Sequence, residues 1–230
     1  MAKATKPKLK IMVSSTVHGI QPMLQQIYGQ LEGYGYEVWM SAMGTIPNFF
    51  TNHAFTDCLK AVESCDLFLS LITPRYGSVV DDVGITHQEL AKAIDRKVPR
   101  WVMVHERVTL LRAFFNKLEH GSIDKRKELL DWLGYDDPDA YKAMVKRESN
   151  IVDDFRVVDM FDIASQQTVK PPQRQGNWVQ PYSVEEDVRR YVNAQFGDYG
   201  RIEKQIEVQQ NAAAKKATRA KTAKKARRKK

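Results

Sequence analysis

The sequence predicts an open, mainly parallel α/β sheet of about five strands with helices on both of its faces. Two observations lead to this prediction. Short apolar runs and amphipathic segments alternate four times over roughly the first 100 residues, the order of elements in a parallel sheet with helical crossovers. Residues 67–72 are apolar almost without interruption, as is typical of a parallel strand covered on both faces.

Each element follows from its own pattern. Strands are expected where apolar residues run together, at residues 9–15, 36–40, 67–72 and 101–104. Helices are expected where apolar side chains recur three and four positions apart, around residues 22–31, 55–62 and 90–94. Pro22 suits a first helical turn, and Gly33 ends the first helical pattern.

The second half of the chain breaks this rhythm. Residues 107–150 have a helical pattern with dense charge, and we interpret them as a helical insertion. Residues 155–163 are rich in Val, Met, Phe and Ile and are expected to form the fifth strand. Ser183 to Glu186 match the S/T-x-x-E capping box, which predicts a last helix running to about Phe196.

The basic character of the chain belongs to its C-terminus. The formal net charge is +8, and residues 211–230 hold ten Lys or Arg and no Asp or Glu, so residues 1–210 carry a net charge of −2. From Gly197 onward the sequence has helix-forming residues but no apolar face to bury. We therefore expect one domain over residues 8–200 and a disordered, basic Ala/Lys-rich tail over residues 201–230.

The charge of this tail predicts non-specific, salt-sensitive binding to nucleic acid. The cations expected to make these contacts include Lys224, Lys225, Arg227 and Arg228. An acidic protein, an anionic membrane surface and a role in solubility are the alternatives.

Several classes of protein are disfavoured by what the sequence lacks. No apolar run reaches the roughly 18–20 residues that cross a bilayer, and the N-terminus has no signal-peptide pattern, so a cytoplasmic protein is expected. Cys58 and Cys65 have neither a redox nor a zinc spacing and are expected to be buried thiols. The histidines form no metal motif, and neither GxxxxGK[ST] nor a GxGxxG after the first strand occurs.

Three loops are expected to meet at the carboxyl edge of the sheet, where ligands bind in such folds. Ser14, Ser15 and Thr16 follow the first strand and offer hydroxyl and amide groups to a phosphate or ribose. Arg75 and Tyr76 follow the third strand. There the guanidinium can clamp a phosphate and the ring can stack on a base. Alternatively, the Arg pairs with a neighbouring acid and the Tyr fills the loop.

The third loop contains the carboxylates. Asp81 and Asp82 precede Glu89, and Asp82 in particular is a candidate to orient a ribose hydroxyl, although both acids also suit an exposed loop. Glu89 is the candidate catalytic residue, because a carboxylate facing this crevice can stabilise or attack an oxocarbenium-like centre during N-glycosidic cleavage. The alternative is structural, since Thr86 to Glu89 also match a capping box.

A larger set of residues resembles a known family. The set comprises Ile11–Thr16, Cys58–Phe68, Arg75–Ser78, Glu89 and a Lys97-Val98-Pro99 lead into the next strand. It resembles a widespread bacterial domain family of unknown function that is similar in fold to Toll/interleukin-1 receptor (TIR) domains and nucleoside 2-deoxyribosyltransferases. The resemblance implies a flavodoxin-like or TIR-like sheet. In both enzyme groups a catalytic Glu lies near the start of the helix after the third strand, the place of Glu89.

The resemblance also implies a function. The chain is expected to bind a nucleotide or nucleoside and to cleave an N-glycosidic bond, as an NAD hydrolase or a deoxyribosyltransferase-like enzyme, in bacterial defence or stress signalling. The nucleotide is substrate or ligand, no further cofactor or metal is expected, and the protein is expected to assemble with itself or with a partner protein. The alternative is a non-catalytic module that senses a nucleotide or assembles proteins while its tail binds nucleic acid.

Overall fold

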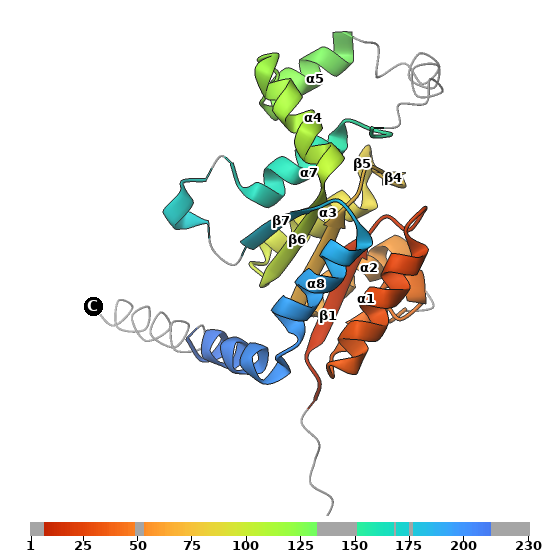
Figure 1. The fold of residues 1–230 in the computed structure, drawn as a ribbon, viewed down its shortest axis with the longest axis vertical. Helices are drawn as coiled ribbons and strands as arrows, with labels where there is room; N and C mark the ends of the chain where they lie inside the picture. The colour runs from red at the N-terminus through yellow and green to blue at the C-terminus, as the bar shows by residue number, and fades with distance from the viewer. Residues whose placement is uncertain (1–6, 49–52, 133–150, 168, 175–176, 213–230) are drawn as a thin grey trace, which may run out of the picture.

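A computed structural model describes residues 7–48, 53–132, 151–167, 169–174 and 177–212 (Figure 1). Its centre is a sheet of five parallel strands in the order β2-β1-β3-β6-β7. The bounds are Lys10–Ser15 for β1, Glu37–Trp39 for β2, Leu67–Ile72 for β3, Arg100–His105 for β6 and Asn177–Tyr182 for β7. This confirms the predicted open α/β sheet. A short hairpin of β4 (Val79–Val80) and β5 (Val83–Gly84) forms a separate antiparallel pair.

Helices cover both faces of the sheet (Figure 1). α1 (Gln21–Gly33) and α8 (Glu185–Phe196) pack on one face, and α2 (Ala54–Ser64), α3 (Ile85–Asp95) and α7 (Arg156–Ser165) pack on the other. β3 lies between these two layers, and all six of its residues are buried. Its alternate side chains therefore enter different cores, with Leu69 on the α1 side and Phe68 on the α2 side.

The expected strand at residues 155–163 is wrong, because the chain forms α7 there. A short, dense apolar run does not by itself distinguish a buried strand from a buried helix. The positions of Asp159 and Asp162 favour the helix over the strand, because two residues three positions apart lie on the same side of a helix. There they bind the guanidinium of Arg126, whose side chain is only 1% exposed, and Asp159 accepts from its Nη2 at 2.7 Å.

The fifth strand lies instead at β7, in a segment between residues 163 and 183 for which we predicted no strand or helix from the sequence. β7 contains Pro181 and, among the described strands, pairs with β6 alone, so it is an edge strand of the described sheet. Proline is tolerated at an edge because the amide hydrogen that it lacks is not needed by a further strand. The weak apolar character of this strand explains why its pattern did not reveal it.

Two details near the C-terminal end also differ from expectation. α8 begins at Glu185, and the carboxylate that caps it is that of Asp187, which accepts from the amides of Ser183 and Val184 at 3.0 and 3.2 Å. The predicted capping residue Glu186 pairs instead with Arg189. In addition, residues 199–212 are helical, so the chain does not lose its apolar face at residue 197. This segment buries two side chains in the α1 core, Ile202 and Ile206.

The region expected to be a helical insertion contains α4 (Glu106–Lys117) and α5 (Ile123–Trp132). The remainder of the predicted insertion, residues 133–150, lies outside the described residues, as do the four tail cations Lys224, Lys225, Arg227 and Arg228. Two short 3-10 turns, η1 (Ser41–Met43) and η2 (Pro171–Gln173), complete the described elements. In the described part of the chain, no helix has the length and apolar character needed to span a bilayer.

Candidate functional site

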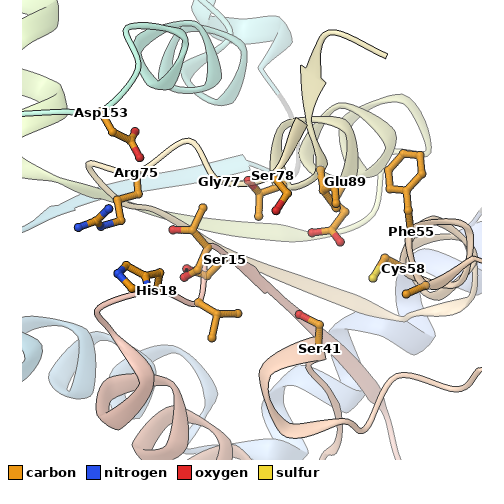
Figure 2. Close-up of a pocket in the computed structure, with 15 residues that line it drawn as sticks. Ser15, His18, Ser41, Phe55, Cys58, Arg75, Gly77, Ser78, Glu89 and Asp153 are labelled. Atoms are coloured by element: carbon orange, nitrogen blue, oxygen red, sulfur yellow. Dashed lines mark hydrogen bonds between the residues drawn. The ribbon is translucent and has the colours of Figure 1, made fainter. Parts of the chain in front are cut away.

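A pocket of about 620 Å³ opens at the carboxyl edge of the sheet. It lies where the loops after β1 and β3 meet the start of α3, as the order of the parallel strands predicted. Figure 2 shows that the two ends of the pocket are lined by different side chains. Glu89, Cys58 and Phe55 lie at one end, and Arg75, His18 and Asp153 lie at the other.

Glu89 is buried at the inner end of this pocket, with 4% of its surface exposed. It lies in the second turn of α3, because the helix begins at Ile85, and its carboxylate accepts a 2.5 Å hydrogen bond from the Ser14 hydroxyl. Thr86 is inside the helix and the N-cap residue is Gly84, which has no side-chain cap. The capping-box interpretation of Thr86 to Glu89 is therefore wrong, and Glu89 instead contributes to the lining of the pocket.

The surroundings of Glu89 shift the pKa of its carboxyl group. Burial raises the pKa of Glu89 to about 7, against hydrogen bonds from Ser14 and Cys58 that lower it. Close to neutral pH, the carboxyl group therefore populates both its neutral and its anionic form. A carboxyl group balanced in this way, inside a pocket, is characteristic of sites that perform acid, base or nucleophilic chemistry.

Cys58 is one of the residues of this site that the sequence did not reveal. It lies on α2, whose Ala61 and Val62 pack into the core, and its thiol lines the pocket at the end where Glu89 lies. Burial, together with the charge of Glu89, raises the pKa of Cys58 to about 12, so the thiol is neutral. Phe55, one turn earlier, adds a half-buried aromatic ring to the same wall.

The opposite wall is built from the loops after β1 and β3. The hydroxyl groups of Thr16 and Thr73 lie 2.6 Å apart, and the amide of Arg75 donates to Thr73 Oγ1 at 3.1 Å. Ser15 and Thr16 both line the pocket. Gly77 has a φ of 83°, and a Cβ at this position would lie 2.7 Å from the Thr16 methyl group. Only glycine allows the two loops to approach so closely.

Arg75 is exposed at the outer end of the pocket, and no ion pair joins it to a described residue. Asp153 lies beside it and accepts from the amide of Tyr76 at 2.8 Å. Burial raises the pKa of Asp153, and the charge of Arg75 is among the smaller effects that lower it. The guanidinium of Arg75 thus remains available to an anionic group of a ligand.

Three predicted positions are not brought to the pocket lining. Ser14 lies beneath it and acts through Glu89. Tyr76 is 2% exposed, with its ring 4.5 Å from the Arg156 guanidinium and its hydroxyl 2.8 Å from His87 Nδ1. It therefore fills the loop, as the alternative interpretation had it. Asp82 is an exposed residue of the β4–β5 turn whose carbonyl accepts from Arg156.

The described residues contain no group of three or more His, Cys, Asp or Glu arranged to hold a metal ion. The side chains that line the pocket offer three kinds of group to a ligand. Glu89 offers a buried carboxylate, the hydroxyl groups of Ser15 and Thr16 offer hydrogen bonds, and Arg75 offers a positive charge.

The fold and the pocket define an α/β domain with a pocket at the carboxyl edge of its sheet and a buried carboxylate in the lining of that pocket. Residues 10–167 match the model of a family described as a domain of unknown function (DUF4062). The match runs from the start of β1 to just beyond the end of α7 and covers more than half of the sequence, so the chain belongs to this family. No curated protein matches the chain.

Proposed function

We propose that this domain binds a nucleotide or nucleoside and cleaves its N-glycosidic bond, with Glu89 as the catalytic carboxylate. One observation carries the proposal: the carboxylate lies buried at the inner end of a pocket at the carboxyl edge of the sheet, 2.5 Å from Ser14 Oγ. The resemblance to TIR domains and nucleoside 2-deoxyribosyltransferases gives the same position a catalytic Glu. It also suggests a setting in bacterial defence or stress signalling.

The reaction needs little besides the carboxylate. As the bond between the sugar carbon and the base nitrogen breaks, its electron pair leaves with the base and positive charge develops on the sugar ring. Anionic Glu89 stabilises that charge, or attacks the sugar carbon to give an ester that water hydrolyses. Burial strengthens the electrostatic effect, because few water molecules screen the charge.

The rest of the pocket suits the other parts of a nucleotide. Phe55 lies beside Glu89 and offers its ring to a base, since aromatic rings stack on any base. Ser15 lies between the two ends, and the hydroxyl groups of Ser15 and Thr16, which both line the pocket, are offered to the sugar. Arg75 at the outer end offers its guanidinium to a phosphate, which it can bind through two hydrogen bonds.

The direct test is to incubate the purified protein at high concentration with NAD and with panels of nucleosides, deoxynucleosides and their 5′-phosphates. Chromatography then measures the release of nicotinamide or free base. The expected result is release by the wild type that Glu89→Gln abolishes. Glu63→Gln is the matched control, because Glu63 is an exposed residue of α2 that pairs with Lys92 outside the pocket.

The same experiment separates the catalytic proposal from the non-catalytic alternative. Thermal shift with each compound reports binding independently of cleavage. If a nucleotide binds and no base is released, the proposal of cleavage fails and the domain is a nucleotide sensor. If no compound binds or is cleaved, even after the protein has assembled at high concentration, both interpretations of the pocket fail.

A further inference from the structure

The backbone on both sides of Arg75 is held by one residue from a distant part of the chain. The amide of Asp153 donates to the carbonyl of Pro74 at 3.0 Å, and Asp153 Oδ1 accepts from the amide of Tyr76 at 2.8 Å. The amide of Arg75 itself donates to Thr73 Oγ1 at 3.1 Å. Figure 2 shows Asp153 and Arg75 next to each other at the outer end of the pocket. The residues that flank Arg75 are therefore fixed from outside the loop that carries it.

We infer that Asp153 is a positioning residue for Arg75, because its two backbone contacts set the direction in which the loop presents the guanidinium at the outer end of the pocket. The consequence for a ligand rests on the proposed function, in which Arg75 binds the phosphate of a nucleotide. The two contacts themselves do not depend on any ligand.

The place of the Arg75 guanidinium depends on the backbone beneath it. Arg75 is an exposed residue, and its side chain extends toward the loop after β1, where a Cβ added to Gly19 would lie 3.9 Å from Arg75 Nε. A small rotation of the peptide groups of this loop would carry the end of so long a side chain away from a ligand. A backbone that is already fixed also reduces the ordering that must accompany binding, which is the physical basis of preorganisation.

Asp153 can fix this loop because its own neighbours in the chain are held firmly. Val152 is 4% exposed and belongs to the core, and Asp154 forms an ion pair with Arg156 in which Oδ2 and Nη2 are 2.6 Å apart. The Arg156 guanidinium in turn lies 4.5 Å from the centre of the Tyr76 ring. The chain at the start of α7 thus contacts Tyr76 twice, through its amide from Asp153 and through its ring from Arg156.

The Asp153 side chain brings two properties to this place, a hydrogen-bond acceptor and a negative charge. Only the acceptor is needed to bind the Tyr76 amide, and the oxygen of an asparagine side chain would also serve. Burial raises the pKa of Asp153, while the Tyr76 amide and, more weakly, the charge of Arg75 lower it. Beside a bound phosphate, the charge of Asp153 would repel the ligand. Removal of the acceptor and removal of the charge therefore have different expected effects, and two substitutions separate them.

The first test measures hydrogen exchange of the Tyr76 amide in the full chain without any ligand, by nuclear magnetic resonance of isotope-labelled protein. Asp153→Ala removes the acceptor, so the exchange rate of this amide should rise about tenfold or more. Asp153→Asn keeps an acceptor at the same place, so its rate should stay within about threefold of the wild-type rate. Far-ultraviolet circular dichroism confirms that each variant is folded.

Asp124→Ala is the matched control for this test, because Asp124 is an exposed acid of α5 that does not line the pocket. It should leave the exchange rate of the Tyr76 amide unchanged. Equal rates in the wild type and Asp153→Ala would overturn the inference, because Asp153 would then not hold the loop. A rate in Asp153→Asn as high as that in Asp153→Ala would also overturn it, since the acceptor would then not be the group that matters.

The second test measures whether a ligand depends on the position of Arg75. Isothermal titration compares the 5′-monophosphates of adenosine, guanosine, cytidine and uridine with the four nucleosides. Asp153→Ala should lower the affinity for a 5′-monophosphate by about three- to tenfold and leave that for its nucleoside within about twofold. Asp153→Asn should bind the 5′-monophosphate at least as tightly as the wild type, because Arg75 is still held and the repulsive charge is absent. This variant keeps the test decisive if Asp153→Ala does not fold.

A double-mutant cycle with Arg75→Gln separates positioning from a general loss of structure. If Asp153 acts through Arg75, Asp153→Ala in the Arg75→Gln background should change the affinity for the 5′-monophosphate by less than about twofold. An equal loss of affinity in both backgrounds, or an equal loss for the nucleoside, would reject the positioning role. A loss in Asp153→Asn as large as that in Asp153→Ala would reject it too.

The exchange measurement keeps this inference separate from the proposed function. If no compound binds the wild type, the proposed function fails, and the exchange rates alone decide whether Asp153 holds the loop. If nucleotides are bound and cleaved while the Tyr76 amide does not respond to Asp153→Ala, the proposed function is retained and the positioning role is rejected.

Discussion

The hydroxyl of Ser14 donates a 2.5 Å hydrogen bond to the carboxylate of Glu89 across 75 residues of sequence. This bond joins the end of β1 to the second turn of α3 and is buried. It fixes the carboxylate at the inner end of the pocket, where burial makes the anionic form costly. The buried carboxylate therefore lowers the free energy of unfolding when it is ionised. Such a cost to stability is common for the chemical groups of functional sites.

Glu89→Gln should stabilise the protein in a pH-dependent manner. Burial raises the pKa of Glu89 to about 7 in the folded state, from 4.5 in the unfolded chain. Between these values the unfolded chain has lost the proton that the folded protein retains, so stability falls as pH rises through this window. At about 1.4 kcal/mol for each pH unit, the variant should gain about 3 kcal/mol relative to wild type between pH 4.5 and pH 8.

Urea unfolding of both proteins at several pH values measures this difference directly. Glu63→Gln should show no such gain, because pairing with Lys92 lowers the pKa of Glu63 instead. A constant difference between Glu89→Gln and wild type across the pH range would mean that Glu89 is not destabilised by ionisation in the folded state.

The pocket also depends on the close approach of two loops at Gly77. Gly77→Ala places a Cβ 2.7 Å from the Thr16 methyl group and imposes a positive φ on alanine, so we expect a loss of about 1 to 3 kcal/mol in the free energy of unfolding. Gly29→Ala should have the opposite sign, a gain of about 0.5 to 1 kcal/mol, because Gly29 lies within α1 and a Cβ there meets nothing within 4 Å. Denaturant unfolding of Gly77→Ala and Gly29→Ala measures the two changes in the free energy of unfolding. Equal changes in the two variants would contradict the close contact between the two loops at Gly77.

The sequence and the structure agree where local pattern is sufficient. β3 is an apolar run that is buried on both faces, and such a run has few other solutions in an alternating α/β chain. α7 and β7 differ from expectation because their identity depends on tertiary partners. Arg126 selects the helical face of α7, and β6 provides the pairing for β7.

The candidate site also contains residues that local sequence pattern predicts and residues that only tertiary packing brings together. Glu89 follows from its place after the third strand, because parallel strands end at one edge of the sheet. The sequence does not distinguish Arg75, which lines the pocket, from Tyr76, which is buried under Arg156, since adjacent loop residues point in different directions. Cys58 and Phe55 join the site only because α2 packs against α3, and no local pattern encodes that contact.

The basic tail should bind nucleic acid independently of sequence. We expect the full chain to bind duplex DNA with an affinity that falls as salt increases, by a slope of about −0.9 in log–log units for each phosphate neutralised. Changing four tail cations to Gln together, Lys224, Lys225, Arg227 and Arg228, should weaken binding and make this slope shallower. Lys117→Gln with Lys125→Gln, two exposed positions on the body, should leave the slope unchanged. Fluorescence anisotropy at several salt concentrations measures it, and equal slopes in all three proteins would exclude the tail as the binding element.

Arg75 should determine whether the pocket prefers a nucleotide to a nucleoside. Its guanidinium forms no ion pair with a described residue, and it lies at the opposite end of the pocket from Glu89. A phosphate bound there gains charge-assisted hydrogen bonds that a free 5′-hydroxyl group does not make. Arg75→Gln should therefore lower the affinity for a nucleoside 5′-phosphate by about tenfold or more, while the affinity for the matching nucleoside stays within about twofold.

Isothermal titration with the two compounds measures this preference in wild type, Arg75→Gln and Arg189→Gln. The last variant removes an equal charge from an exposed position on α8 and should retain the wild-type preference. An equal loss of affinity for both compounds in Arg75→Gln would place the guanidinium on the sugar or base instead of the phosphate. Unchanged affinity for both would remove Arg75 from the ligand site altogether, and the polarity of the pocket would then need another explanation.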